Sequence, residues 1–167
     1  MYLDRFQPLQ TSTGGRGIPG RDLILRHVEA HGSGGDQWTQ YEIRWTPGGT
    51  FRLLFPLTNE GPVPVTVTEV GEFPQTTYEG WSVSALRYTI DPNLGTETLR
   101  SFMPFTLQPE QIAQFEITIS MDRELRGEEC FVLADIPVRF QAFWVEREEQ
   151  VFPRVVVVAS GQPGGLC

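Results

Sequence analysis

Short runs in which apolar and polar residues alternate constrain the fold of this chain more than any other feature. Phe115, Ile117, Ile119 and Met121, for example, alternate with polar residues. Successive side chains of a strand point to opposite faces, so this period of two predicts strands with one buried face. Similar runs lie between turns rich in glycine and proline at 38–45, 51–57, 63–68, 81–90 and 136–159. We predict an all-β chain that forms an antiparallel β-sandwich, although a barrel would show the same alternation.

Two pairs of runs are predicted to form hairpins. Residues 38–45 and 51–57 flank the turn sequence TPGGT, and residues 136–159 surround the acidic sequence EREEQ, to which we assign the second turn. Trp45 and Trp144 share strand faces with other apolar residues, so we expect both in the core.

The first 22 residues have a different composition. The sequence TSTGGRGIPG is rich in glycine and offers little to bury. We therefore predict a flexible N-terminal arm or linker at 1–22 and a single β-sandwich domain at 23–167, a length that suits one core. The arm also carries apolar residues, which we expect to dock on the parent sheet or on a neighbour. They are Tyr2, Leu3, Phe6, Leu9 and Ile18.

Charge and composition argue against several classes of function. The net charge of −8 disfavours nucleic-acid binding, which depends on cationic groups that displace counterions. All 13 basic residues are arginine, so a phosphate-binding loop with its lysine and Schiff-base chemistry are both excluded. No motif joins a nucleophile to a base, and we predict no enzymatic activity, catalytic residue or cofactor.

Two groups of residues could bind a metal, but neither predicts a site. His27 and His31 flank Glu29 and would share one face of a helix, whereas on a strand they would lie about 13 Å apart. Acidic residues that could supply calcium ligands lack the spacing of a calcium loop, and we interpret them as a solvated acidic surface. They are Asp122, Glu124, Glu128, Glu129, Glu146, Glu148 and Glu149.

Two tryptophans are candidates for stacking on a ligand. Trp38 and Trp81 lie near predicted turns, where an exposed indole could bind a sugar ring. Ordinary packing remains the alternative for both side chains.

Cys130 and Cys167 are the only cysteines, and we predict a disulfide between them. The C-terminal sequence SGQPGGLC is too polar to be held by burial, so a covalent bond would explain its order. Such a bond indicates an oxidising compartment. The first ten residues lack the apolar run of a signal peptide, and no segment reaches the roughly 18 apolar residues of a membrane span. Membrane attachment would need an anchor absent from this chain.

Two stretches resemble known domains. FRLLFPLTNEGPVPVTVTEV is similar to paired strands of bacterial immunoglobulin-like domains, and FMPFTLQPEQIAQFEITIS resembles a later strand of such domains. The second also resembles uncharacterised membrane-anchored envelope proteins of actinobacteria. The resemblance implies an immunoglobulin-like (Ig-like) fold over about residues 38–167 and a place outside the cell or in its envelope. We expect a domain that binds another protein or self-assembles, or alternatively a carbohydrate-binding module that uses Trp38 or Trp81.

Overall fold

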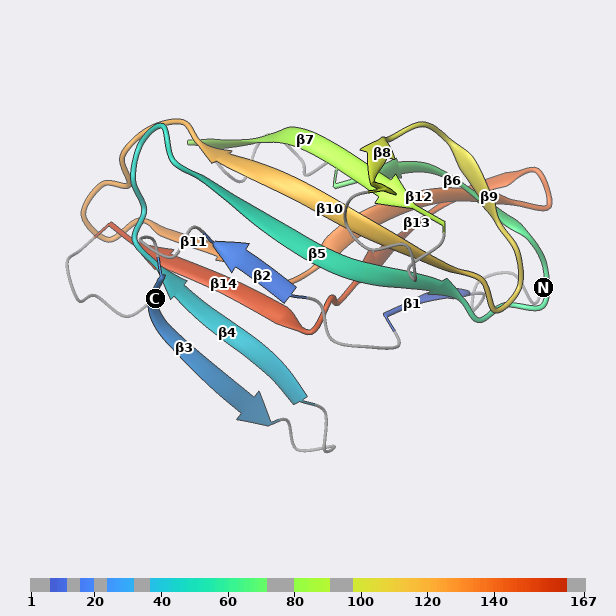
Figure 1. Ribbon diagram of the computed structural model, residues 1–167, viewed down its shortest axis with the longest axis horizontal. Coiled ribbons are helices and arrows are strands. Elements are labelled where there is room, and N and C mark those ends of the chain that lie inside the picture. The colour runs from blue at the N-terminus through green and yellow to red at the C-terminus, as the bar shows by residue number, and fades with distance from the viewer. Residues whose placement is uncertain are drawn as a thin grey trace.

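The computed structural model describes residues 7–11, 16–19, 24–31, 37–71, 80–90 and 98–161. Every element in these ranges is a β-strand, and the strands form three sheets (Figure 1). The all-β prediction is therefore confirmed. Within the same ranges we find no helix with the length and apolar character that crossing a bilayer requires.

The first sheet has the order β1-β5-β10-β7-β8, and β2 also pairs with β5. Long antiparallel ladders join β10 to both β5 and β7. The strands are β1 (Leu9–Gln10), β2 (Arg16–Pro19), β5 (Thr50–Asn59), β7 (Trp81–Thr89), β8 (Arg100–Ser101) and β10 (Ile112–Met121).

The other two sheets each contain one half of a long hairpin formed by residues 130–160, in which β12 pairs with β13 and β11 pairs with β14. The second has the order β13-β12-β6-β9, and the third β11-β14-β4-β3. All pairs are antiparallel except β4 with β14. The second sheet contains β6 (Val65–Val70), β9 (Phe105–Leu107), β12 (Ile136–Ala142) and β13 (Val145–Val151). The third contains β3 (Ile24–His31), β4 (Gln37–Ile43), β11 (Cys130–Leu133) and β14 (Val155–Ser160).

The strand order is that of an Ig-like sandwich. We letter β2, β5, β6, β7, β10, β12 and β13 as A to G in chain order. The first sheet then reads A-B-E-D and the second G-F-C, which is the arrangement of the constant-type immunoglobulin domain. The predicted antiparallel Ig-like β-sandwich is confirmed.

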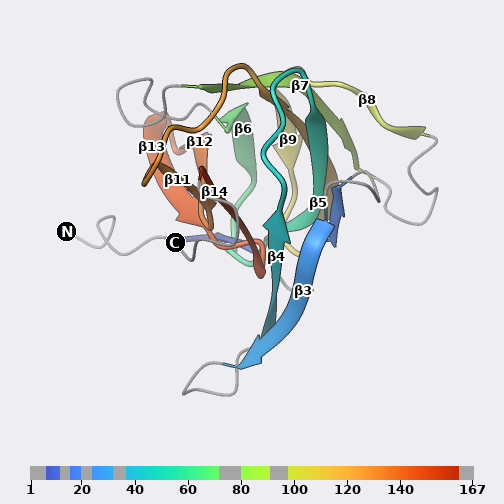
Figure 2. The same cartoon turned by 90° about the vertical axis from the view of Figure 1, so that its left-hand side faces the viewer.

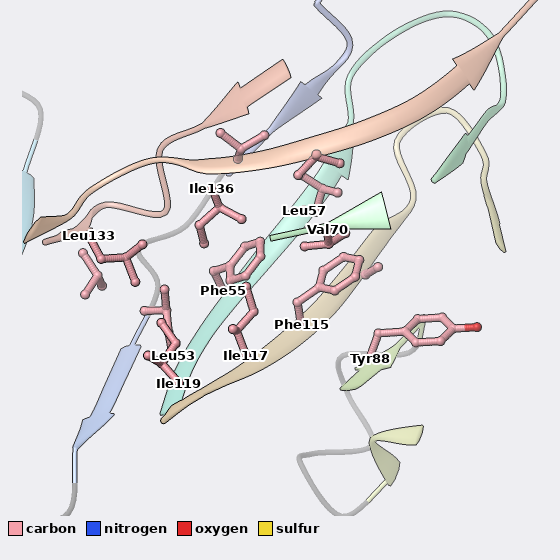
Figure 3. Packing of buried hydrophobic residues seen from close by; sticks show 14 of the residues in the cluster. Leu53, Phe55, Leu57, Val70, Tyr88, Phe115, Ile117, Ile119, Leu133 and Ile136 are labelled. Carbon is pink, nitrogen blue, oxygen red and sulfur yellow. The ribbon is translucent and has the colours of Figure 1, made fainter. Parts of the chain in front are cut away.

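The core lies between the facing sheets and follows the alternation in the sequence. Phe55, Phe115 and Ile117 project from β5 and β10 toward Val70 and Ile136 of the second sheet (Figure 3). All five side chains are buried. The alternate residues predicted to point inward on β5 and β10 are fully buried as well. They are Phe51, Leu53, Phe55 and Leu57 on β5, and Phe115, Ile117, Ile119 and Met121 on β10.

Two short strands fall inside residues 1–22, the predicted arm. The backbone of β2 pairs with residues 51–54 of β5, and β1 pairs with Asn59 and Thr58. Leu9 is 2% exposed, so this apolar residue docks on the parent sheet. The A-B-E-D sheet therefore includes residues from before position 23. Tyr2, Leu3 and Phe6 lie outside the described residues.

Two details of the predicted hairpins were wrong. β4 and β5 do not pair, because β4 lies between β3 and β14 while β5 belongs to the first sheet. The final hairpin forms, but EREEQ lies within β13 and the turn is made by Phe143 and Trp144. Both errors come from treating the nearest turn sequence as the point where a strand reverses.

Candidate functional site

The structure separates the two tryptophans that the sequence nominated for stacking. Trp38 lies on β4 and is half-buried, with its ring edge-on to Phe152 at 6.5 Å between centroids. Trp81 begins β7, packs against the core and meets Phe131 edge-on at 5.3 Å. The two indoles therefore belong to different packing clusters.

The remaining two tryptophans differ in their exposure. Trp45 is partly buried against Phe131, and its Nε1 donates a hydrogen bond to the Arg123 carbonyl oxygen at 2.6 Å. The expectation that Trp144 lies in the core was wrong, because its side chain is 90% exposed at the β12–β13 turn. Neighbouring Phe143 is 52% exposed. These aromatic rings form the tip of a hairpin rather than part of a strand face.

The backbone of this turn is strained. Phe143 and Trp144 have φ values of 49° and 67°, which are the positive values of a type I′ hairpin turn. Glycine and asparagine are the residues usually found there, since a bulky side chain costs about 1–2 kcal/mol in this conformation. Glu110 in the β9–β10 turn also has a positive φ, of 62°. Such strain is often concentrated at functional positions.

Three loops meet at this end of the sandwich (Figure 1). β6 pairs with both β12 and β9, so the loop before β6 lies between the β12–β13 turn and the β9–β10 turn. We call residues 60–64, 108–111 and 143–146 together the Trp144 pole. Its exposed apolar residues are Pro62, Pro64, Pro109, Phe143, Trp144 and Val145.

Asn59 fixes two of these loops to each other. Its buried side-chain amide donates to the carbonyl oxygens of Val63 at 2.8 Å and Leu107 at 3.0 Å. Its side-chain oxygen accepts a hydrogen bond from the Gly61 N–H at 3.0 Å. The Glu110 N–H donates to the Asn59 carbonyl oxygen at 2.7 Å. The loops of the pole are thus held in place by a fully buried residue.

The charged residues of the Trp144 pole are all acidic. The three segments contain Glu60, Glu110 and Glu146, all exposed, and no basic residue. Glu146 lies 3.7 Å from Arg139 of β12, which also pairs with Glu69 and Glu148. The pole therefore combines exposed aromatic rings with an acidic border.

The β3–β4 hairpin is a second prominent feature and projects away from the sandwich (Figures 1 and 2). Among the described strands, β3 is the last of its sheet and pairs only with β4. A register shift between Ile24 and Arg26 leaves 26–31 in regular pairing. The other edge of these six residues has no strand beside it in the described part of the chain.

The structure shows how the possible metal ligands named from the sequence are arranged. His27 and His31 lie on a strand, so the helical arrangement that would bring them together is excluded. Glu129 binds Arg123 at 2.7 Å, and this hydrogen bond is the main cause that lowers the Glu129 pKa to about 2. Among the described residues, no three His, Cys, Asp or Glu side chains are grouped as a metal site requires.

Cys130 begins β11 and is exposed, opposite Ser160 of β14. The described part of the chain contains no free cysteine. Cys167 lies outside the described residues, so the Cys130–Cys167 disulfide stays a prediction. Ser160 is seven positions before Cys167, which places the start of the C-terminal segment beside Cys130.

Sequence reasoning missed the Trp144 pole, although a change in the phase of the apolar alternation near residue 143 could have indicated the turn. Ala142 and Val145 are directly opposed in the β12–β13 ladder, and two residues between facing strands define a tight hairpin. The apolar alternation changes phase at this point. Two aromatic residues hid the turn because they are typical of strands.

Comparisons with known proteins assign no family. No family model matches the chain, and neither does any curated protein. The chain is similar to the solved structure of the Vibrio cholerae VesB protease, with 11% identity and a TM-score of 0.40 over 81% of this chain and 32% of that one. It is also similar to PapD-like domain 7 of human CEP192, with 12% identity and a TM-score of 0.33 over 82% and 85% of the two chains. The chain spans about a third of the protease, and the fold assignment rests on the strand order alone.

Proposed function

We propose that this chain is a non-enzymatic protein-interaction or assembly domain that works outside the cytoplasm, in a bacterial cell envelope. The observation that carries the proposal is the outer edge of β3, which no described strand covers, on a projecting hairpin. An unpaired edge presents backbone N–H and C=O groups to which another strand can add.

The other edges of the sandwich are shorter or better protected. β9 has three residues, and β2 and β11 have four each. Among the described residues β8 pairs only with Arg87 and Tyr88 of β7, but a register shift between Val83 and Ala85 interrupts the remaining edge of β7. Such a bulge opposes the addition of a strand. β13 is long, but Arg147 and Glu149 lie opposite the buried residues Phe140 and Val138 and thus point inward. Inward charges on an edge strand oppose the addition of another strand. β3 is therefore the edge best suited to assembly among the described strands.

The sequence of β3 suits pairing with a second copy of the chain. In a symmetric antiparallel pair, hydrogen-bonded and non-hydrogen-bonded positions alternate, so the two-fold axis must pass through a residue pair. With the axis at Val28, His27 of each copy lies opposite Glu29 of the other. β3 contains one arginine, one glutamate and two histidines, so its formal charge is neutral and does not oppose self-pairing.

The cellular location belongs to the same proposal. It is supported by the resemblance to envelope proteins and by the predicted Cys130–Cys167 disulfide, which needs an oxidising compartment. The absence of catalytic activity is supported by the lack of any motif that joins a nucleophile, a base and an orienting group. A panel of glycan and ester substrates tests this part, and hydrolysis that depends on one acidic residue would contradict it.

Carbohydrate binding through Trp38 or Trp81 remains the alternative function. Trp38 is half-buried and Trp81 packs against the core, so neither presents the open aromatic face that sugar stacking uses.

Proline substitution on β3 tests assembly. In the β3–β4 ladder, the N–H groups of neighbouring residues point alternately to β4 and outward. Of the two variants Val28→Pro and Glu29→Pro, one therefore removes an N–H that points outward, and the other removes an N–H that is bonded to β4. The variant that loses less thermal stability is the one that lacks the outward N–H. We expect this variant to weaken self-association at least about tenfold in sedimentation velocity. Equal sedimentation of this variant and the wild type would contradict the proposal, as would a wild type that stays monomeric up to about 1 mM.

A further inference from the structure

We infer that the Trp144 pole is a docking site for a basic segment of another protein, with Trp144 as its anchor. The pole lies at the end of the second sheet, whereas β3 belongs to the third, and the inference does not depend on assembly through the β3 edge. Three observations carry it: the exposure of the aromatic turn, its conformation and the charge around it.

The exposure of Trp144 has no explanation in the packing of the residues that the structure describes. Trp144 is 90% exposed, while the core beneath it is closed by Ala142 and Phe140, which are 5% and 1% exposed. A polar residue at position 144 would leave this core unchanged. Exposed tryptophan is uncommon on soluble domains and is enriched among the residues that anchor protein interfaces.

The conformation of the pole is fixed before any partner binds. Of the four described non-glycine residues with positive φ, three belong to the pole: Glu110, Phe143 and Trp144. The Asn59 hydrogen bonds hold the two neighbouring loops, and the β12–β13 ladder holds the turn. A rigid aromatic anchor loses little conformational entropy on binding, which favours affinity.

The charge of the pole selects the partner. Each of the three loops of the pole carries one exposed glutamate, Glu60, Glu110 and Glu146, and the pole contains no arginine or lysine. An arginine or lysine of a partner could pair with these carboxylates and stack on the indole, the aromatic group that binds cations best. The same charges disfavour an anionic membrane surface.

A second copy of the chain fits this site poorly. Two poles placed face to face would bring six carboxylates together. Arg52 and Arg87 pair with Glu116, and Arg139 pairs with Glu69, so these three arginines are held within their own chain. The occupant is therefore a different, positively charged protein segment.

Selection from a random-peptide phage library on the immobilised full chain tests this inference. We expect enriched peptides with net positive charge. Synthetic versions should bind Trp144→Ser at least about tenfold more weakly than the wild type. Replacing Glu60, Glu110 and Glu146 by glutamine should weaken binding and reduce its dependence on salt.

A matched control is Val132→Ser, which removes an exposed apolar side chain from β11, at a distance from the pole. This variant should bind the peptides as the wild type does. Neutral or acidic peptides, or equal losses for Trp144→Ser and Val132→Ser, would overturn the inference. The inference would also be overturned if no enriched peptide required Trp144 for binding. This holds even if the wild type binds a glycan array or phosphatidylcholine vesicles through Trp144.

Discussion

The Glu149 carboxylate accepts a hydrogen bond from the backbone N–H of Leu9 at 3.3 Å, which joins the first described strand to β13. β1 pairs at the same time with β5 of the opposite sheet. The Thr11 hydroxyl donates to the Phe152 carbonyl oxygen at 2.5 Å, just beyond β13. β1 therefore connects the two sheets of the sandwich along one open side.

The burial of Glu149 makes stability depend on pH. Burial raises the pKa of Glu149 to about 7 from 4.5, although the Leu9 N–H acts in the opposite direction. Because the pKa is raised in the folded state, the protonated Glu149 carboxyl contributes to the free energy of unfolding fully below about pH 4.5. This contribution is lost as the pH rises through about 7. We expect Glu149→Gln to gain about 1–2 kcal/mol relative to the wild type at about pH 8, and little at about pH 4, after allowing for solvent screening.

Urea unfolding at several pH values measures this difference. Glu148→Gln is the matched control, because its exposed side chain lies on the other face of β13. A constant difference between Glu149→Gln and the wild type across the pH range would contradict the assigned role of Glu149.

Asn59→Ala should be strongly destabilising. The substitution leaves the Gly61 N–H and the carbonyl oxygens of Val63 and Leu107 without their side-chain partner. Because Asn59 is fully buried, we expect a loss of about 2–4 kcal/mol in the free energy of unfolding. Gln108→Ala, at an exposed position of the same pole, should cost less than about 1 kcal/mol. Similar losses for the two variants would show that Asn59 does not organise the loops.

The two arginines that flank Glu116 should act together. Arg52 and Arg87 each lie 3.2 Å from one oxygen of the Glu116 carboxylate, whose side chain is 3% exposed. Either Arg→Ala substitution leaves this carboxylate with one cationic partner and should cost about 1 kcal/mol. The double substitution leaves a buried charge unpaired and should cost about 3–5 kcal/mol. A double-mutant cycle measures by how much the loss of stability in the double variant exceeds the sum of the two single losses. Additive losses would contradict the role of the shared carboxylate.

The Cys130–Cys167 disulfide predicts a mass about 2 Da below that of the dithiol, because forming the bond removes two hydrogens. Intact mass spectrometry of the non-reduced chain, with alkylation before and after reduction, measures it. The bond should add about 4 kcal/mol on the chain-entropy model, less any strain. Alkylation of both cysteines before reduction would remove the main support for an extracytoplasmic location.

The sequence predicted the strands better than their partners. Alternation at Phe51, Leu53 and Phe55 identifies a buried strand face, because burial on one face is a local consequence of side-chain geometry. Which strand pairs with which depends on the whole core. This is why β5 pairs with β10, more than fifty residues later, and not with the adjacent β4.

The candidate sites were less accessible to sequence reasoning for similar reasons. Trp144 occurs between strand-forming residues, and its exposure follows from its place in a two-residue turn that no pattern of apolar residues reports. The position of β3 at the edge of the described strands of its sheet is a property of sheet order, not of its own eight residues. The pairing of Cys130, in contrast, could be proposed from the count of cysteines alone.

Hydrogen–deuterium exchange of the β3 amides as a function of protein concentration tests the central claim most directly. Assembly through the free edge of β3 would protect the outward N–H groups, which are every second residue between Arg26 and His31. We predict that protection of this alternate set rises with concentration, while the intervening amides, which are bonded to β4, change little. Exchange at all β3 amides that is independent of concentration would contradict assembly through this edge.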